Sequence, residues 1–169
     1  MRTGSVFVGG GIILMLVLIM TSGAPAAPLV IYNPSPSVPI GFYRRVANPP
    51  HEGAFVTVRA VTVAADYATQ RGFGGPRNWF IKRVAATGRV RVCANGALVN
   101  VGGAVLIRRR VDSAGRLLPW WTGCRLLADD EVFLAGDTAD SFDSRYWGPV
   151  RIDQIDGAWA PLCPTRSEN

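Results

Sequence analysis

The sequence predicts a mostly β fold, arranged as a barrel or a sandwich, with a transmembrane or signal helix at its N-terminus. Short stretches rich in β-branched and aromatic residues are separated by turn residues at intervals of roughly 8–12 residues, which is typical of such folds. The 169 residues include 19 Gly and 12 Pro, which favour turns over long helices. This length suits one compact domain in addition to a targeting segment.

The N-terminal segment is apolar. No charged residue occurs between Arg2 and Arg44, and residues 6–20 read VFVGGGIILMLVLIM. Extended to residues 3–23, the segment reaches the roughly 20 residues that an α-helix needs to cross a bilayer. It therefore predicts a helix that either spans a membrane or serves as a signal peptide.

Both interpretations of this segment export the rest of the chain. An uncleaved anchor would leave Arg2 in the cytoplasm, whereas a signal peptide would be cut near the A-x-A pattern at residues 24–26. We favour the anchor. It divides the chain into a membrane segment at residues 1–28 and an exported domain at residues 29–169, on the periplasmic side of a bacterial inner membrane.

The exported part consists mainly of expected strands. Alternating or β-branched stretches occur at residues 41–46, 54–59, 79–84, 89–93, 97–101, 104–110, 131–135 and 149–152. Residues 60–70 have moderate helical character. Residues 112–130 are expected to form a long loop, and the three arginines at 108–110 a solvated strand end.

The cysteines fit an exported domain. Cys93, Cys124 and Cys163 form no C-x-x-C pair, and the only histidine, His51, is remote from them in sequence, so we expect no metal site. In an oxidising compartment one disulfide and one spare thiol are expected. Cys93–Cys124 is the pair we favour, although spacing alone does not fix the connectivity.

Composition also bears on the partners. The formal net charge is +6, but the chain has no compact basic and aromatic motif of the kind found in nucleic-acid binders. We therefore expect no nucleic-acid partner. A basic surface of this kind also suits the anionic lipid of the inner membrane.

One basic residue differs from all the others. Of the 18 basic residues, Lys82 is the only lysine, and lysine, unlike arginine, can lose its proton when it is buried. Alternation in the expected strand 79–84 places Lys82 on the apolar face with Phe80 and Val84. Burial would lower its pKa from about 10.4 by as much as about 3–5 pH units, which suits a general base. The alternative is an ordinary surface lysine.

A candidate nucleophile lies in a proline-rich stretch. Ser35 and Ser37 alternate with prolines at positions 34, 36 and 39, and prolines stiffen the backbone and remove N–H donors. The alternative interpretation of this stretch is a rigid linker that leaves the membrane.

Three segments together resemble the conjugative-transfer (TraF-type) branch of the type I signal peptidase family. Residues 37–43, SVPIGFY, are similar to its S-x-P-x-G-x-Y nucleophile box, and residues 81–84, IKRV, to its lysine box. Residues 136–148, GDTADSFDSRYWG, resemble its C-terminal G-D-x…S-x-D-S-R-x-x-G box. The boxes occur in family order, and the resemblance covers about residues 30–152. It implies a signal-peptidase-like catalytic domain.

The resemblance implies a role for each matching residue. Ser37 would be the nucleophile and Lys82 its general base. Ser35 would donate its hydroxyl to the oxyanion hole beside the Ser37 N–H. Ser141 would bond to the lysine amine and orient it.

Asp143 and Arg145 match a structural pair that shapes the site in this family. The chain departs from the family pattern after the lysine, where Thr87-Gly88-Arg89 replaces a P-G-D turn. That turn is not catalytic in the family. The departure therefore bears on local strand geometry and not on the chemistry.

The implied function is that of a membrane-anchored Ser/Lys endopeptidase that processes exported precursors. The expected substrate is a pilin-like precursor of conjugation and type IV secretion, matured by cleavage with or without cyclisation. No cofactor is implied, and we expect a monomer. Two alternatives are a general signal peptidase I and a non-enzymatic exported component of a secretion apparatus.

Overall fold

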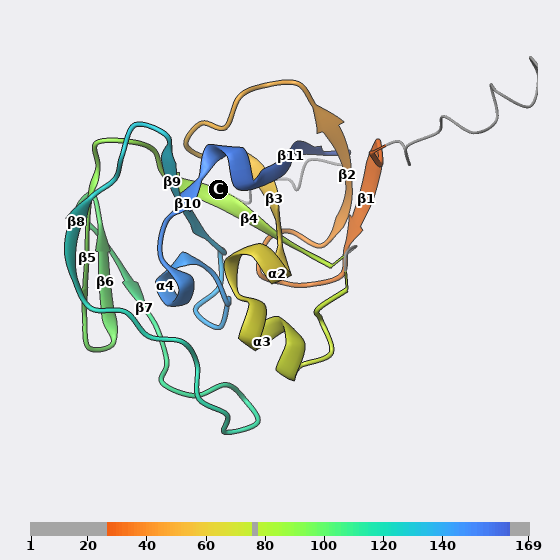
Figure 1. Ribbon diagram of the computed structural model, residues 1–169. Coiled ribbons are helices and arrows are strands. Elements are labelled where there is room, and N and C mark those ends of the chain that lie inside the picture. The colour runs from red at the N-terminus through yellow and green to blue at the C-terminus, as the bar shows by residue number, and fades with distance from the viewer. Residues whose placement is uncertain (1–26, 76–77, 163–169) are drawn as a thin grey trace, which may run out of the picture.

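The computed structural model describes residues 27–75 and 78–162, which form two antiparallel β-sheets (Figure 1). The larger sheet has the strand order β1 (Val30–Asn33), β2 (Gly41–Val46), β11 (Ile155–Pro161), β3 (Phe55–Arg59), β4 (Trp79–Ala86), β9 (Glu131–Ala135) and β10 (Val150–Arg151). The smaller sheet has the order β7 (Ala104–Ile107), β6 (Leu98–Val101), β5 (Arg91–Asn95) and β8 (Gly123–Leu126). The short helices are α2 (Ala60–Val63), α3 (Ala65–Gln70), α4 (Ser144–Trp147) and the 3₁₀-helix η1 (Ile152–Gln154).

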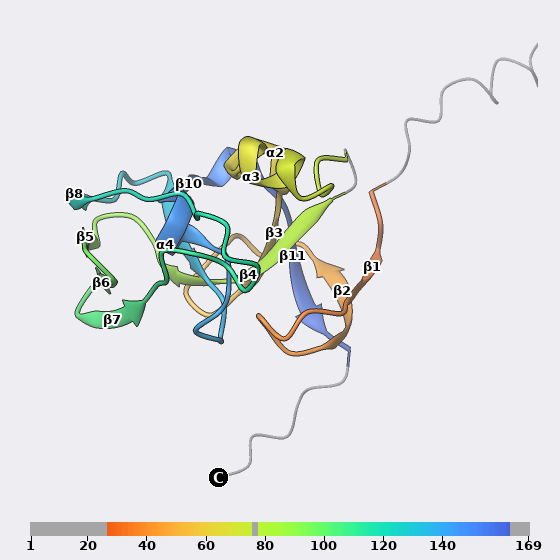
Figure 2. The same cartoon turned by 90° about the horizontal axis from the view of Figure 1, so that it is seen from below.

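The two sheets lie in different parts of the molecule. The smaller sheet is at the end opposite β1 and β2 in both views (Figures 1 and 2). Between these ends, α3 packs against β4 through Tyr67, whose ring centroid is 6.5 Å from that of Phe80. The middle of the larger sheet is therefore covered by the helical segment that follows β3.

Alternation along the central strands buries both faces of the larger sheet. On one face, Val56 and Val58 of β3 pack in a cluster with Val84 of β4. On the other face, Ile81 of β4 packs in a cluster with Trp159 of β11. Apolar contacts on both faces fix β4 in position, and this strand carries the only lysine.

The smaller sheet has its own core and a disulfide. The inward side chains are Val92, Ala94, Val99 and Val101, which pack with Leu127 and Phe133. Cys93 and Cys124 are direct neighbours on β5 and β8, and the structure joins them in a disulfide. This is the pair that the sequence favoured.

The mostly β fold class is confirmed, but the barrel is not. In the part of the chain that the structure describes, no hydrogen-bonded pairing joins β1 to β10, so the larger sheet stays open. The chain instead distributes its strands over an open sheet and a separate four-stranded sheet.

The expected elements agree with the structure in part. Strands at 41–46 and 131–135 have the predicted bounds. The helix expected at 60–70 is divided at Ala64, whose φ of −154° and ψ of 58° are not helical. The loop expected at 112–130 contains β8. The strands β1 and β11 and the helix α4 were not predicted.

The strand expected at 104–110 ends at Ile107, and the solvated strand end is wrong for Arg108. This side chain is only 1% exposed. Its guanidinium donates to the carbonyl oxygens of Gly96, Trp121 and Arg145. These acceptors replace water, so Arg108 leaves the sheet and turns inward.

The predicted N-terminal helix, at residues 3–23, lies outside the described residues. Within residues 27–75 and 78–162, none of the helices is long and apolar enough to cross a membrane.

Candidate active site

Ser37 lies in the seven-residue loop between β1 and β2, and it is 6% exposed. Its neighbour Val38 is 1% exposed and packs in the apolar cluster that contains Tyr43 and Trp159. Val38 therefore packs the proline-rich loop against the larger sheet, and the Ser37 side chain next to it is also buried. The loop is therefore packed against the domain and is not a linker.

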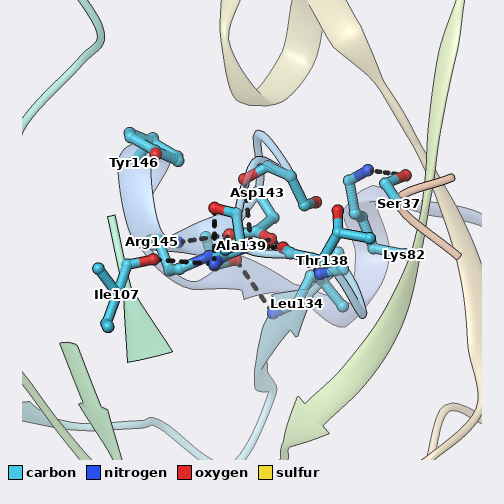
Figure 3. Close-up of polar contacts among 12 residues, drawn as sticks. Ser37, Lys82, Ile107, Leu134, Thr138, Ala139, Asp143, Arg145 and Tyr146 are labelled. Carbon is cyan, nitrogen blue, oxygen red and sulfur yellow. Dashed lines mark hydrogen bonds and ion pairs between the residues drawn. The ribbon is translucent and has the colours of Figure 1, made fainter. Parts of the chain in front are cut away.

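Lys82 faces the loop 34–40 from the centre of β4. It pairs across the sheet with Val56 of β3, on the apolar face that the sequence predicted, and it is only 4% exposed. Its Nζ donates a hydrogen bond to Ser37 Oγ at 2.7 Å (Figure 3). When the amine is neutral, the same contact allows the Ser37 hydroxyl to donate to the nitrogen lone pair.

Burial lowers the pKa of Lys82 from 10.5 to about 8, because the apolar surroundings disfavour the ammonium form. The carboxylates of Asp143 and Asp137 act in the opposite direction, and the Arg145 guanidinium lowers the pKa further. The amine is therefore neutral in a substantial fraction of molecules slightly above neutral pH, as a general base requires.

The pH dependence of cleavage follows from this pKa. A lysine in the role of general base expected for Lys82 must be unprotonated, so kcat/KM should rise about tenfold per pH unit below pH 8 and level off above it. Measuring the profile from pH 6 to 10 on a peptide substrate tests this. His51→Gln is the matched control, because His51 is exposed and its loss should leave the profile unchanged. A profile that is flat through pH 8 would contradict the assignment.

The two expected oxyanion-hole donors are bonded to each other in the structure. The Ser37 N–H donates to Ser35 Oγ at 3.3 Å, and Ser35 Oγ donates to Ser37 Oγ at 3.2 Å. A substrate carbonyl oxygen would have to replace Ser35 Oγ as the acceptor of the Ser37 N–H. Ser35 is exposed, so its hydroxyl has room to rotate about the Cα–Cβ bond.

Ser141 does not make the contact that the sequence led us to expect. It is 3% exposed, but its hydroxyl has no hydrogen-bond partner among the described residues, Lys82 included. It packs instead against Gly136, where a Cβ would overlap the Ser141 side chain and the Ser37 carbonyl oxygen. The lysine amine is oriented by Ser37 and by its apolar surroundings.

Asp143 and Arg145 form a buried ion pair beside the site. Both side chains are at most 3% exposed, and the Arg145 guanidinium donates to both carboxylate oxygens, at 2.8 and 2.6 Å. The same guanidinium donates to the carbonyl oxygens of Ile107, Thr138 and Ala139 (Figure 3). It also donates to the Ser141 carbonyl oxygen. The pair therefore organises the segment 136–143.

The segment 136–143 is hydrogen-bonded to the loop 34–40. The Asp137 N–H donates to the Ser37 carbonyl oxygen at 2.6 Å. The Asp137 carboxylate accepts two hydrogen bonds from Arg83, at 2.8 and 2.9 Å. Asp143 in turn accepts from the Gly136 N–H. The Asp137 contact could not be predicted from the sequence, because its donor is a backbone amide.

A cleft of about 780 Å³ opens onto the Ser37 and Lys82 side chains. Ser37 and Lys82 lie in its wall together with aromatic residues from three elements, Tyr32, Tyr67 and Phe80. The volume is within the range of ligand-binding pockets. Among the described residues, no group of three His, Cys, Asp or Glu side chains is placed to hold a metal.

Comparisons with known proteins show the family of this chain. A family model described as signal peptidase, peptidase S26, matches residues 5–162. The chain belongs to the S26 signal peptidase family. Two relatives, both plasmid transfer proteins TraF of Escherichia coli, are 34% and 31% identical over 166 and 157 residues. They cover 90% and 86% of this chain, and the matches span 90% and 88% of their own lengths.

The chain is thus a TraF-type member of the family, as the three boxes predicted. Among solved structures, a signal peptidase I from Enterococcus faecalis is similar with a TM-score of 0.37 and 18% identity. The similarity covers 66% of this chain and 97% of that chain.

Proposed function

We propose that this S26 member is a serine endopeptidase in which Ser37 is the nucleophile and Lys82 the general base. The observation that carries the proposal is the 2.7 Å contact between two buried side chains, Lys82 Nζ and Ser37 Oγ. A buried lysine next to a serine hydroxyl is arranged for proton transfer, because burial favours the neutral amine.

The reaction follows from this contact. Neutral Lys82 takes the hydroxyl proton as Ser37 Oγ attacks the scissile carbonyl carbon, and the carbonyl oxygen becomes an oxyanion. The Ser37 N–H and the rotated Ser35 hydroxyl stabilise this charge. The C–N bond then breaks, the leaving amine takes the proton from Lys82, and an acyl-enzyme ester forms on Ser37.

The second half of the reaction determines the product. Water can attack the ester after it loses a proton to Lys82, and this releases a carboxylic acid. An amine of the bound peptide can attack instead, which forms a new peptide bond and a cyclic product. Both routes regenerate the Ser37 hydroxyl, so the same residues serve hydrolysis and cyclisation.

We propose that the substrate is an exported pilin-like precursor. Support comes from the relatives, which are named as plasmid transfer proteins, and from a cleft large enough for several peptide residues. The carboxyl-terminal fragment leaves as the free amine in either route. The amino-terminal fragment, which is bound to Ser37 as the acyl-enzyme, is therefore the part of the substrate that differs between hydrolysis and cyclisation.

We also propose that the domain works at the periplasmic face of the inner membrane, attached through its apolar N-terminal segment. Large apolar side chains are exposed near the point where this segment joins the domain. They are Leu29, Val30, Tyr32, Ile40 and Phe42, with exposures of 48–75%. Such a patch suits contact with a lipid surface, where membrane-delivered substrates emerge.

Ser37→Ala should reduce the rate of cleavage of a candidate pilin precursor by at least about 10³-fold, because no other group can form the acyl-enzyme. Intact-mass analysis of the precursor with and without the enzyme measures this. A cyclic product is one water lighter than the hydrolysed one. Ser113→Ala, at a position in the loop before β8, is the control and should cleave normally. Full activity of Ser37→Ala would contradict the proposed function.

A further inference from the structure

Asn33 is a buried polar residue that lies outside the three family boxes and has no role in the proposed reaction. It is the last residue of β1, it pairs with Gly41 at the start of β2, and it is 3% exposed. Asn33 and Gly41 therefore flank the loop 34–40, which carries the nucleophile. A polar side chain in this position needs hydrogen-bond partners within the loop.

The Asn33 side chain finds these partners on the loop backbone. Its Nδ2 donates to the carbonyl oxygens of Ser35 at 2.8 Å, Val38 at 3.1 Å and Pro39 at 3.1 Å. Its Oδ1 accepts from the Ser35 N–H at 3.1 Å. One side chain thus joins backbone groups on both sides of Ser37.

The loop needs such a side chain because its own donors are few. Three of the seven residues at 34–40 are prolines, which have no N–H. Of the remaining amides, that of Ser35 donates to Asn33 itself and that of Ser37 to Ser35 Oγ. The side-chain amide of Asn33 supplies the N–H donors that the proline-rich backbone lacks.

From this geometry we infer that Asn33 is a positioning residue that holds Ser37 Oγ against Lys82 Nζ. The inference rests on the proposed function, in which Ser37 is the nucleophile. The Asp137 N–H fixes the Ser37 carbonyl from outside the loop, and Asn33 fixes the backbone before and after Ser37 from inside. Only the exposed Ser35 hydroxyl then has to rotate when substrate enters.

Two variants separate this role from simple space filling. Asn33→Asp has the same shape and keeps the acceptor for the Ser35 N–H, but it replaces the amide donor with an oxygen that faces three carbonyl oxygens. Asn33→Ala removes donor and acceptor together. If Asn33 only fills space, Asn33→Asp should behave as wild type. If it positions the loop, both variants should lose activity.

We expect kcat to fall roughly 100-fold in both variants with KM little changed, because a displacement of the nucleophile of about 1 Å has an effect of this size. The midpoint of the pH–rate profile of Asn33→Ala should stay near pH 8, since Lys82 is unchanged in this variant. Asn48→Asp, in the exposed loop after β2, is the matched control and should keep wild-type kcat. Wild-type kcat in Asn33→Asp would overturn the inference.

Amide hydrogen exchange tests the same inference without relying on activity. In Asn33→Ala the amides of Ser35, Ser37 and Val38 should exchange faster than in wild type, while those of β3, β4 and β9 keep their protection. Unchanged exchange in the loop would overturn the positioning role whatever the kinetics show. If Ser37→Ala stayed active while the loop amides of Asn33→Ala exchanged faster, the proposed function would be contradicted. Asn33 would then order the loop without serving catalysis.

Discussion

Lys82→Arg is expected to reduce cleavage by at least roughly 10³-fold while the domain stays folded. Arginine keeps the positive charge, but its pKa is too high for it to become neutral in a protein. It therefore cannot accept the proton of Ser37 Oγ, which lies 2.7 Å from Lys82 Nζ. Single-turnover cleavage of a peptide substrate at pH 9 measures the loss under conditions in which the wild-type amine is largely neutral.

Two further variants make this result interpretable. Lys82→Met has an unbranched apolar side chain of similar length, so it fits the buried site and should be equally inactive without an added charge. Arg91→Lys is the reverse substitution, arginine to lysine, at an exposed position of β5, and this variant should have wild-type activity. Cleavage by Lys82→Arg within tenfold of wild type would show that the lysine does not act as a base.

Asp143→Asn is expected to lower the free energy of unfolding by about 3–5 kcal/mol, the usual loss when one partner of a buried ion pair is removed. Asparagine has almost the same shape, but it leaves the guanidinium of Arg145, 3% exposed, without a counter-charge. The segment 136–143 should loosen, and kcat should fall because the Asp137 N–H holds the Ser37 carbonyl. Urea denaturation under oxidising conditions measures the change in stability.

The control for this loss is an ion pair of the same kind on the surface. Asp153 pairs with Arg151 at 2.9 Å, and both side chains are more than half exposed. Asp153→Asn should therefore leave the free energy of unfolding nearly unchanged. Equal losses in Asp143→Asn and Asp153→Asn would contradict the structural role of the buried pair.

The reactive residues could be predicted from the sequence because they carry chemical signals that do not depend on long-range packing. Lys82 is the only lysine, and the alternation of β4 placed it on the correct face. Ser37 and the pair Asp143–Arg145 were found through the family boxes. The structure brings Ser37 and Lys82 into contact and pairs Asp143 with Arg145.

The supporting contacts could not be predicted, because most of them involve backbone groups. Asn33 and the Asp137 amide act on carbonyl oxygens, whose positions depend on the folded loop. Ser141 was assigned a contact with the lysine, but its side chain packs closely against Gly136, and its hydroxyl has no hydrogen-bond partner among the described residues. Arg108 was placed in solvent because sequence patterns do not show that three carbonyl oxygens meet it in the interior.

The strands that the sequence did not predict also depend on distant partners. All four residues of β8 are exposed, so this strand shows no alternation and is defined by its pairing and its disulfide with β5. β11 contains a glycine and ends at Pro161, and it pairs with β2 and β3, which lie about a hundred residues earlier. Local propensity carries little information about such pairings.

The most direct test of the Ser37–Lys82 assignment is the titration of Lys82 itself. Because the chain has a single lysine, labelling lysine with ¹³C at Cε gives one side-chain NMR signal in the folded protein. The signal should titrate with a midpoint near pH 8, since burial lowers this pKa from 10.5. A midpoint near 10.5, the value of a solvated lysine, would contradict the account of Lys82 as the general base.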